Sequence, residues 1–243
     1  MDLLTRTGGY TLLIADDAQQ VAAAQRLRYQ VFAGELGATL HTTVPGHDVD
    51  EFDDACDHLI VRDDKSGAIV GTYRMLLPGR APRRYGDTEF DLSALDPLRD
   101  ALVETGRSCV APEHRSGAVI NLMWAGIARY LHLHNKRWLG GCASIPLDDG
   151  GALAASVWER VRTKNISPPR MRVTPRHPWQ VPAAEAASTS GMPPLLRGYL
   201  RLGAWVCGEP AYDPDFDCAD LYVLLSTDRI DPRYRRHFLG EER

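Results

Sequence analysis

The sequence predicts a mixed α/β fold, in which a central sheet carries helices on both of its faces. Short apolar runs alternate with segments of helical periodicity. Two of the runs flank a tight turn, which is typical of an antiparallel hairpin. The order strand, hairpin, strand, helix, strand, helix then combines parallel and antiparallel pairs in one sheet. No internal repeat divides the chain, so we assign residues 1–243 to a single domain, with residues 1–150 as its core and residues 151–243 completing the sheet.

The first third of the chain contains clear element signals. Its expected elements, in order, are a strand at residues 10–15, a helix at residues 16–37, and a hairpin of residues 58–63 with residues 68–77. Asp16 or Asp17 can cap the helix, and Gly37 ends it. Residues 38–57 are polar and acidic without a clear period, which predicts a long loop.

The rest of the chain continues the pattern with less clarity. Its expected elements are a strand at residues 101–111, a helix at 119–135, a strand at 138–144, a helix at 148–165, a strand at 220–226 and a turn or short helix at 231–238. Pro112 ends the first of these strands, and Asp148 or Asp149 can cap the second helix. Residues 167–194 are rich in proline, and residues 195–211 fit either a strand or a helix.

Composition and missing motifs exclude several classes of function. The formal net charge is −4, so no overall basic field indicates nucleic acid as a partner. We find no signal peptide and no uncharged apolar run of about 18 residues, and we therefore expect a cytoplasmic protein. The five cysteines are widely spaced without a CxxC pair, which predicts reduced, buried thiols. The eight histidines lack a second ligand pair, so we expect no metal site.

Six charged residues lie at unusual positions in the first helix, the acidic loop and the strands. They are Arg28, Asp50, Asp53, Arg74, Glu104 and Arg107. Burying an unpaired charge is costly, so we expect them to converge in one network. A β-bulge at Gly106 would bring Glu104 and Arg107 onto one face of their strand. A structural ion pair and a catalytic role both stay open for that pair, and a solvated acidic loop is the simpler interpretation of Asp50 and Asp53.

Five segments in register resemble one branch of the GNAT acyltransferase superfamily. They are RLRYQVFAGELG, DVDEFDDACDHLIV, IVGTYRML, ETGRSCVAPEHR and LGGCASIP. With residues 193–225 they resemble the ornithine acyl-ACP N-acyltransferases, which are often described as hemolysin-like, over nearly the whole chain. The acyl-homoserine-lactone synthases are more distant in this comparison. The positions shared with them are Arg28, Phe32, Asp50, Asp53, Arg74, Glu104 and Arg107.

The resemblance implies a fold and a reaction. The fold is the GNAT-like acyl-CoA N-acyltransferase fold, with the central strand splayed at a bulge. The reaction moves a long-chain 3-hydroxy fatty acyl group directly from the thioester of an acyl carrier protein (ACP) to the amino group of an amino acid, ornithine, and gives a lyso-ornithine-type aminolipid. Acyl-ACP, or acyl-CoA in its place, is a co-substrate, and no cofactor is bound permanently.

The resemblance also implies roles for residues. Glu104 is the general base, directly or through water, and Arg107 is its catalytic companion. Residues expected to bind the acceptor are Arg28, Phe32, Asp50, Asp53 and Arg74. Either Arg74 or Arg107 would hold the acceptor carboxylate, and either Asp50 or Asp53 an ammonium group. Residues expected at the thioester and the phosphopantetheine are Ser108, Cys109, Val110, Arg115, Ser116 and Gly117, because HRSGAV keeps part of a phosphate-binding turn before a helix.

A local group of basic residues suggests a docking surface for an acidic carrier protein. Its members are Arg80, Arg83, Arg84, Lys136 and Arg137. Ordinary solubilising charge is the alternative. Residues 195–206 could contact the inner face of the cell membrane, and core packing is the alternative there. Two other functions stay open, namely an N-acyl amino acid synthase that uses acyl-CoA and another amine, and a non-catalytic acyl-binding or membrane-active protein.

Overall fold

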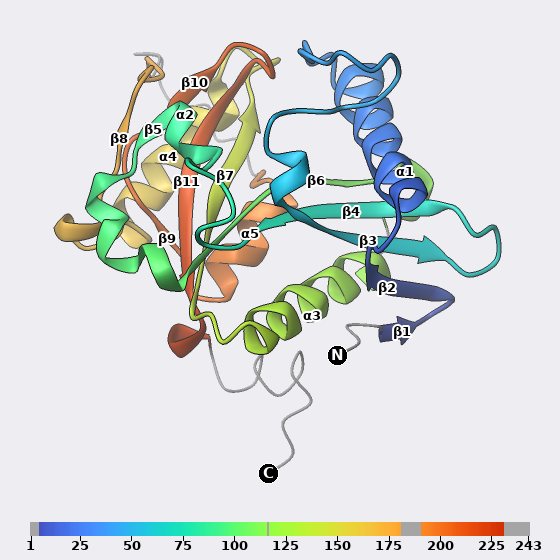
Figure 1. Ribbon diagram of the computed structural model, residues 1–243. Coiled ribbons are helices and arrows are strands. Elements are labelled where there is room, and N and C mark those ends of the chain that lie inside the picture. The colour runs from blue at the N-terminus through green and yellow to red at the C-terminus, as the bar shows by residue number, and fades with distance from the viewer. Residues whose placement is uncertain (1–4, 116, 181–190, 231–243) are drawn as a thin grey trace. The chain divides into compact units, whose positions relative to one another are not determined.

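The computed structural model describes residues 5–115, 117–180 and 191–230, and the chain divides into two compact units (Figure 1). Within these ranges, the first unit contains residues 5–81 and 105–136, and the second contains residues 82–104 and 137–230. The boundary between the units falls inside one strand, β6 (Leu102–Val110). No helix in the described ranges is long and apolar enough to cross a membrane.

The first unit is a mainly antiparallel sheet with a helix on each face. Its strands lie in the order β1 (Thr5–Thr7), β2 (Tyr10–Ile14), β3 (Asp57–Asp63), β4 (Ile69–Leu76) and β6. On one face, α1 (Ala18–Tyr29) packs against β4, and on the other α3 (Gly117–Leu133) packs against β1, β2 and β3 (Figure 1). The predicted hairpin, formed by β3 and β4, and the helices on both faces of the sheet are confirmed.

The first helix follows its sequence signals closely. The Asp17 carboxylate accepts a hydrogen bond from the Gln20 amide at 2.8 Å and so caps the helix. Beyond Tyr29 the chain continues as a π-helical turn, Gln30–Glu35, and it ends next to Gly37, whose φ of 74° is in the left-handed region. The π-helical turn places Phe32 in the interior.

The second unit is built around two long antiparallel strands. Its strands lie in the order β6, β7 (Trp138–Pro146), β11 (Cys218–Ser226) and β10 (Ala211–Asp213), and β9 (Trp205–Val206) also pairs with β11. The helices of this unit are α2 (Gly86–Glu89), α4 (Ala152–Lys164) and α5 (Pro194–Arg201). A small sheet of β5 (Phe90–Asp91) and β8 (Thr174–Pro175) lies apart from the main one. Phe90 and Leu95 pack on Leu102, Tyr222 and Leu224 in the core.

Strand β6 belongs to both units and is irregular in its middle. It pairs in parallel with β7 from Leu102↔Trp138 to Glu104↔Gly140. Three residues further on, Arg107 has a φ of 51°, which is left-handed backbone. We expected the irregularity at Gly106, but the residue with positive φ is its neighbour Arg107. A left-handed non-glycine residue costs about 1–2 kcal/mol, so contacts of the Arg107 side chain must hold it in place.

Elements that depend on tertiary packing were not predicted. Neither β1 nor α2 has a strong local signal, and the 3-10 segment Ser93–Ala101 contains Pro97. The ambiguous residues 195–211 contain both expected kinds of structure, the helix α5 and the strand β9. The predicted turn at residues 231–238 lies outside the described residues.

Candidate active site

A buried network of arginines and aspartates occupies the first unit, and we call it the ion network. Its members are Arg28, Asp48, Asp50, Asp53, Arg74 and Arg107. They come from α1, from the loop before β3, from β4 and from β6. Three guanidinium groups face three carboxylates, so the network is electrically balanced. Balance is what allows charges to be buried, because each partner offsets the desolvation cost of the other.

Arg28 is the centre of the ion network. Its side chain is fully buried, with Nε donating to Asp48 Oδ2 and Nη2 donating to both oxygens of Asp53, each at 2.8 Å. Hydrogen bonds between two charged groups are about twice as strong as those between neutral groups. We therefore infer that Arg28 fixes the acidic loop against α1.

Arg74 extends the ion network to β4. Its Nη1 donates to Asp50 Oδ1 at 2.6 Å and lies 3.4 Å from Asp53 Oδ1. Burial would raise the pKa of Asp50, but Arg74 and Arg107 beside it lower that pKa overall. The simpler interpretation of Asp50 and Asp53 as a solvated acidic loop is wrong, because both are ion-paired and Asp53 is only 5% exposed.

Arg107 completes the ion network from β6 with longer contacts. Its Nε lies 3.4 Å from Asp48 Oδ2, and its Nη2 lies 3.5 Å from Asp50 Oδ2. Its side chain is 14% exposed, against 4% for Arg74. Of these two guanidinium groups, Arg107 is therefore the one that a substrate anion can reach more easily.

Two members of this region were missed in the sequence. Asp48 precedes Asp50 in the same acidic loop, and it could have been found by counting charges, since three buried arginines need a third carboxylate. His58 is buried beside the network, with Nε2 at 3.2 Å from the Asp53 carbonyl oxygen. Burial lowers the pKa of His58, so its ring adds no charge.

Of the six charged residues singled out in the sequence, Glu104 is the one that belongs to the second unit, and its hydrogen-bond partners lie there too. It is 4% exposed, and its carboxylate accepts hydrogen bonds from the Tyr85 amide at 2.6 Å and the Gly86 amide at 2.9 Å. These amides stand at the start of α2. A Cβ at Gly86 would lie 2.9 Å from Glu104 Oε1 and 2.8 Å from Tyr222 Cε2, so only glycine allows this close approach.

Burial gives Glu104 an unusual protonation behaviour. It raises the pKa of this carboxyl to about 7, although the two amides and the nearby Arg84 act in the opposite direction. A carboxyl with such a pKa is present in both protonation states near neutral pH. It can therefore accept a proton from an amine and release it again, as a general base must.

The residues expected at the thioester have varied surroundings. Ser108 and Val110 are partly buried on β6, and Gly117 is the first residue of α3. Burial raises the pKa of the Cys109 thiol to about 12, which leaves it protonated and unsuited to act as a nucleophile. Arg115 is exposed and forms two hydrogen bonds of 2.6 Å with Glu35. Ser116 lies outside the described residues.

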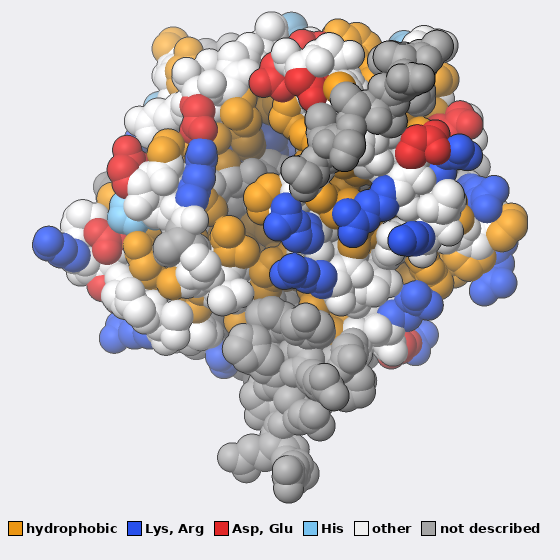
Figure 2. Space-filling model, turned by 180° about the vertical axis from the view of Figure 1, so that it is seen from behind, with side chains coloured by type: hydrophobic (Ala, Val, Ile, Leu, Met, Phe, Trp, Pro, Cys, Tyr) orange, Lys and Arg blue, Asp and Glu red, His pale blue; other side chains and the backbone are white. Residues whose placement is uncertain are grey.

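The residues expected to dock a carrier protein are distributed over both units. Arg80 and Lys136 belong to the first unit, and Arg83 and Arg137 to the second. Arg84, expected on the same surface, is instead 8% exposed, because its guanidinium turns inward to the carboxylate of Asp87. Figure 2 shows several Lys and Arg side chains on the surface of this chain, whose formal net charge is −4.

Comparisons with known proteins identify the family. An acetyltransferase (GNAT) domain matches residues 27–125, a range that contains the whole ion network together with Glu104. An L-ornithine N(alpha)-acyltransferase of Brucella abortus is 34% identical over 98% of this chain and 92% of its own length. One of the same name from Rhodobacter capsulatus is 35% identical over 94% of both chains. This chain belongs to the L-ornithine N(alpha)-acyltransferase family.

Members of this family are acyltransferases, and the chain is therefore an enzyme of that class. The predicted resemblance is confirmed, and the alternative of a non-catalytic acyl-binding protein is not retained. The crystal structure of the AHL synthase LasI has the same fold, with a TM-score of 0.57 at 11% identity over 98% of this chain and 100% of that one. That likeness supports the predicted GNAT-like fold.

Proposed function

We propose that this acyltransferase moves a long-chain 3-hydroxy fatty acyl group from the thioester of an acyl carrier protein to the α-amino group of ornithine. The observation that carries the proposal is the near full-length match to relatives that bear the name L-ornithine N(alpha)-acyltransferase. The acceptor follows from that name. The 3-hydroxyacyl chain and the carrier protein as donor follow from the sequence resemblance and are the finer part of the proposal.

In this proposal, the chemical step is direct transfer without an acyl-enzyme. The amine nitrogen attacks the thioester carbonyl, the C–N bond forms, and the C–S bond breaks to release the carrier thiol. Glu104, directly or through one water, takes the proton that the nitrogen loses and passes it to the departing sulfur. The pKa of about 7 suits both transfers. Cys109 takes no part, because its thiol stays protonated.

The acceptor carboxylate is assigned to Arg107 in this proposal. Of the two strand arginines considered for it, Arg107 is the more exposed and has the longer ion-pair distances. A guanidinium can hold a carboxylate with two parallel hydrogen bonds. Arg28, Asp50, Asp53 and Arg74 then act by fixing the backbone around Arg107, and Phe32 acts by packing in the interior of the first unit.

The carrier protein would approach through the basic residues Arg80, Arg83 and Arg137, which are exposed, and Lys136, which is half-buried. Attraction between opposite charges speeds encounter and weakens in salt. If these residues dock the carrier, replacing all four by glutamine lowers kcat/KM for acyl-ACP at low salt and leaves kcat/KM for acyl-CoA nearly unchanged.

The deciding experiment is a mass-spectrometric acyl-transfer assay. Purified protein is mixed with 3-hydroxyacyl-ACP or 3-hydroxyacyl-CoA and a pool of free amino acids. We expect N-acyl ornithine from acyl-ACP, about 10²- to 10⁴-fold less of it with Glu104→Gln, and an unchanged rate with the exposed control Glu159→Gln. In the wild type, kcat/KM should rise with pH and level off above about 7. Acylation of a different amino acid, or Glu104→Gln at wild-type rate, would contradict the proposal.

A further inference from the structure

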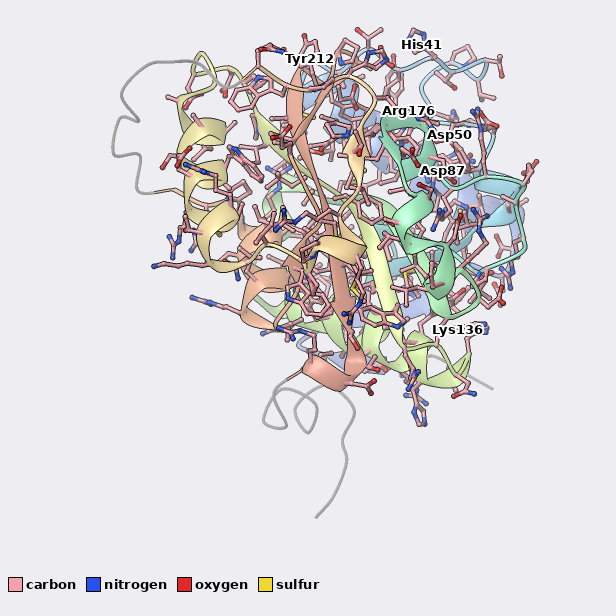
Figure 3. The ribbon with its side chains drawn as sticks, turned by 90° about the vertical axis from the view of Figure 1, so that its left-hand side faces the viewer. His41, Asp50, Asp87, Lys136, Arg176 and Tyr212 are labelled. Atoms are coloured by element: carbon pink, nitrogen blue, oxygen red, sulfur yellow. The ribbon has the colours of Figure 1, made fainter. Side chains whose placement is uncertain are left out.

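A second group of buried acids lies in the second unit, on the sheet face that also carries Glu104. Glu89, the last residue of α2, approaches Cys142 of β7 and Asp220 of β11. One carboxylate oxygen of each acid and the Cys142 sulfur all lie within 4.8 Å of one another. We call these three residues the acidic pocket. In Figure 3, β7 and β11 run side by side, and α2, marked by Asp87, lies beside them. The Arg176 side chain holds α2 by donating to the Asp87 carbonyl oxygen at 2.8 Å.

The strand register places the acidic pocket on the same face as Glu104. Glu104 pairs with Gly140, Tyr222 with Cys142, and Asp220 with Ser144. Alternate residues of a strand point to the same face, so Gly140, Cys142 and Ser144 share one. Burial, followed by the negative charges of Glu89, Asp220 and Glu104, raises the pKa of the Cys142 thiol, so Cys142 lies near all three carboxyls. Ser144, which shares this face, is exposed to solvent.

The acidic pocket has an excess of negative charge. Among the described residues, no arginine or lysine forms an ion pair with Glu89 or Asp220, and Asp213 adds a third carboxyl nearby. Burial and Asp220 raise the pKa of Glu89 well above that of a free glutamate. Two buried carboxyls that cannot both ionise must share a proton or receive a cation.

Polar atoms in and beside the acidic pocket lack partners. Asp220 Oδ1 and the Tyr222 hydroxyl have no hydrogen-bond partner among the described residues. Asp220 is 2% exposed, and Tyr222 is fully buried. Orphaned buried polar atoms are costly, and a native fold keeps them when a ligand completes them. A group that donates hydrogen bonds and carries positive charge would complete these atoms and relieve the repulsion between the two carboxyls.

We propose that the acidic pocket binds the side-chain ammonium group of the amino-acid acceptor. This inference rests on the proposed function, which supplies an acceptor with two amines. A primary ammonium carries one positive charge and three N–H donors, which match the Glu89 and Asp220 carboxylates and a neighbouring hydroxyl. Cys142 lies two residues along β7 from the position opposite Glu104, about 7 Å at strand spacing. An extended ornithine chain spans such a separation between its α-nitrogen and its terminal nitrogen.

The ion network is a poorer place for that ammonium group. We expected Asp50 or Asp53 to hold the ammonium group, but both carboxylates are already paired, Asp53 with Arg28 and Asp50 with Arg74. An ammonium there would have to compete with bound guanidinium groups. In the acidic pocket it would instead relieve a repulsion between acids.

The test compares ornithine with norvaline, which has the same carbon chain without the terminal ammonium. Wild-type protein should bind and acylate ornithine far better than norvaline. Asp220→Asn and Glu89→Gln should each lower kcat/KM for ornithine about 10- to 100-fold and change that for norvaline by less than about twofold. The control Asp228→Asn, an exposed residue of the same unit, should change neither. Circular dichroism and the Tm establish that each variant is folded.

Other outcomes would overturn the proposal. An equal loss on both acceptors, or no loss on either, would show that the acidic pocket does not select the ammonium group. Stoichiometric zinc or manganese in the purified wild type, lost in Asp220→Asn, would make it a metal site instead. If no acceptor is acylated, the proposed function fails. Calorimetry then measures the affinity of the protein for ornithine and for norvaline without any acyl transfer. Equal affinities would refute the proposal that the acidic pocket binds the ammonium group.

Discussion

The two units bury charged side chains with opposite balances. In the first unit, three arginines face three aspartates, and each charge has a partner of the other sign. In the second unit, Glu89, Asp220 and Asp213 lie near one another, and the carboxylate of Glu104 is held mainly by backbone amides. A balanced network offsets its own buried charges and holds the fold together, and the more exposed Arg107 is its member that we assign to the acceptor carboxylate. An unbalanced group of acids has raised pKa values and unfilled hydrogen bonds, and such features are common where substrates bind.

The largest expected effect tests the balance of the ion network. Asp53→Asn removes one of the two carboxylates that pair with the buried Arg28, and loss of one partner from a buried pair costs about 3–5 kcal/mol. We expect the free energy of unfolding, measured by urea titration, to fall by that amount. Asp54→Asn, the exposed neighbour, is the matched control and should change stability by less than about 0.5 kcal/mol. Equal effects of the two variants would mean that the network is not what stabilises the first unit.

The next effect concerns the pH dependence that Glu104 confers on stability. Its pKa is about 7 in the folded protein, against the ordinary value of 4.5. A raised pKa means that the folded state binds the proton more tightly. The stabilisation is therefore complete below about pH 4.5 and is lost as the pH rises through about 7, by roughly 3 kcal/mol in total. Urea titrations between pH 5 and pH 8 should show this decline in the wild type and a flatter profile in Glu104→Gln. Parallel profiles would show that Glu104 titrates normally.

A smaller effect, with the opposite sign from that of Asp53→Asn, is expected in the acidic pocket. Asp220→Asn removes a repulsion and adds an amide donor facing Glu89, so the ligand-free protein should become more stable at pH 8 by about 1 kcal/mol. Thermal denaturation without amino acids measures it, with Asp228→Asn as the control. A destabilised Asp220→Asn protein would show that this carboxylate is paired as well as those of the ion network, and the contrast between the units would disappear.

The smallest effect is expected at the surface. Arg115 and Glu35 form a geometrically good ion pair, but both side chains are partly exposed to solvent. Exposed pairs contribute about 0–1 kcal/mol, so Glu35→Gln should change the free energy of unfolding by less than about 1 kcal/mol. Repeating the measurement at high salt should abolish even this difference. A larger, salt-resistant loss would mean that exposure is a poor guide to the worth of charges in this chain.

Much of the fold was predictable because its signals are local. The cap at Asp17, the glycine after the first helix, and the hairpin turn each depend on a few neighbouring residues. Strands of the second unit were predictable from their apolar runs. The short helix α2 was not, because four residues are too few to show a helical period, and its position is held by contacts with Glu104 and Arg176.

By itself, the sequence determined the α/β class, the order of the long elements and the family. It also singled out six charged residues at unusual positions. Only the tertiary structure decided which partner each charge has. Glu104 and Arg107 are three residues apart on one strand, yet the first meets backbone amides of α2 and the second meets Asp48 and Asp50. Which groups these two side chains contact depends on strand register and on the left-handed backbone at Arg107. In the acidic pocket, the pairing of β7 with β11 brings residues 142 and 220 together, and α2 adds residue 89. Contacts between such distant segments leave no periodic trace in the sequence, because they arise when the sheet assembles.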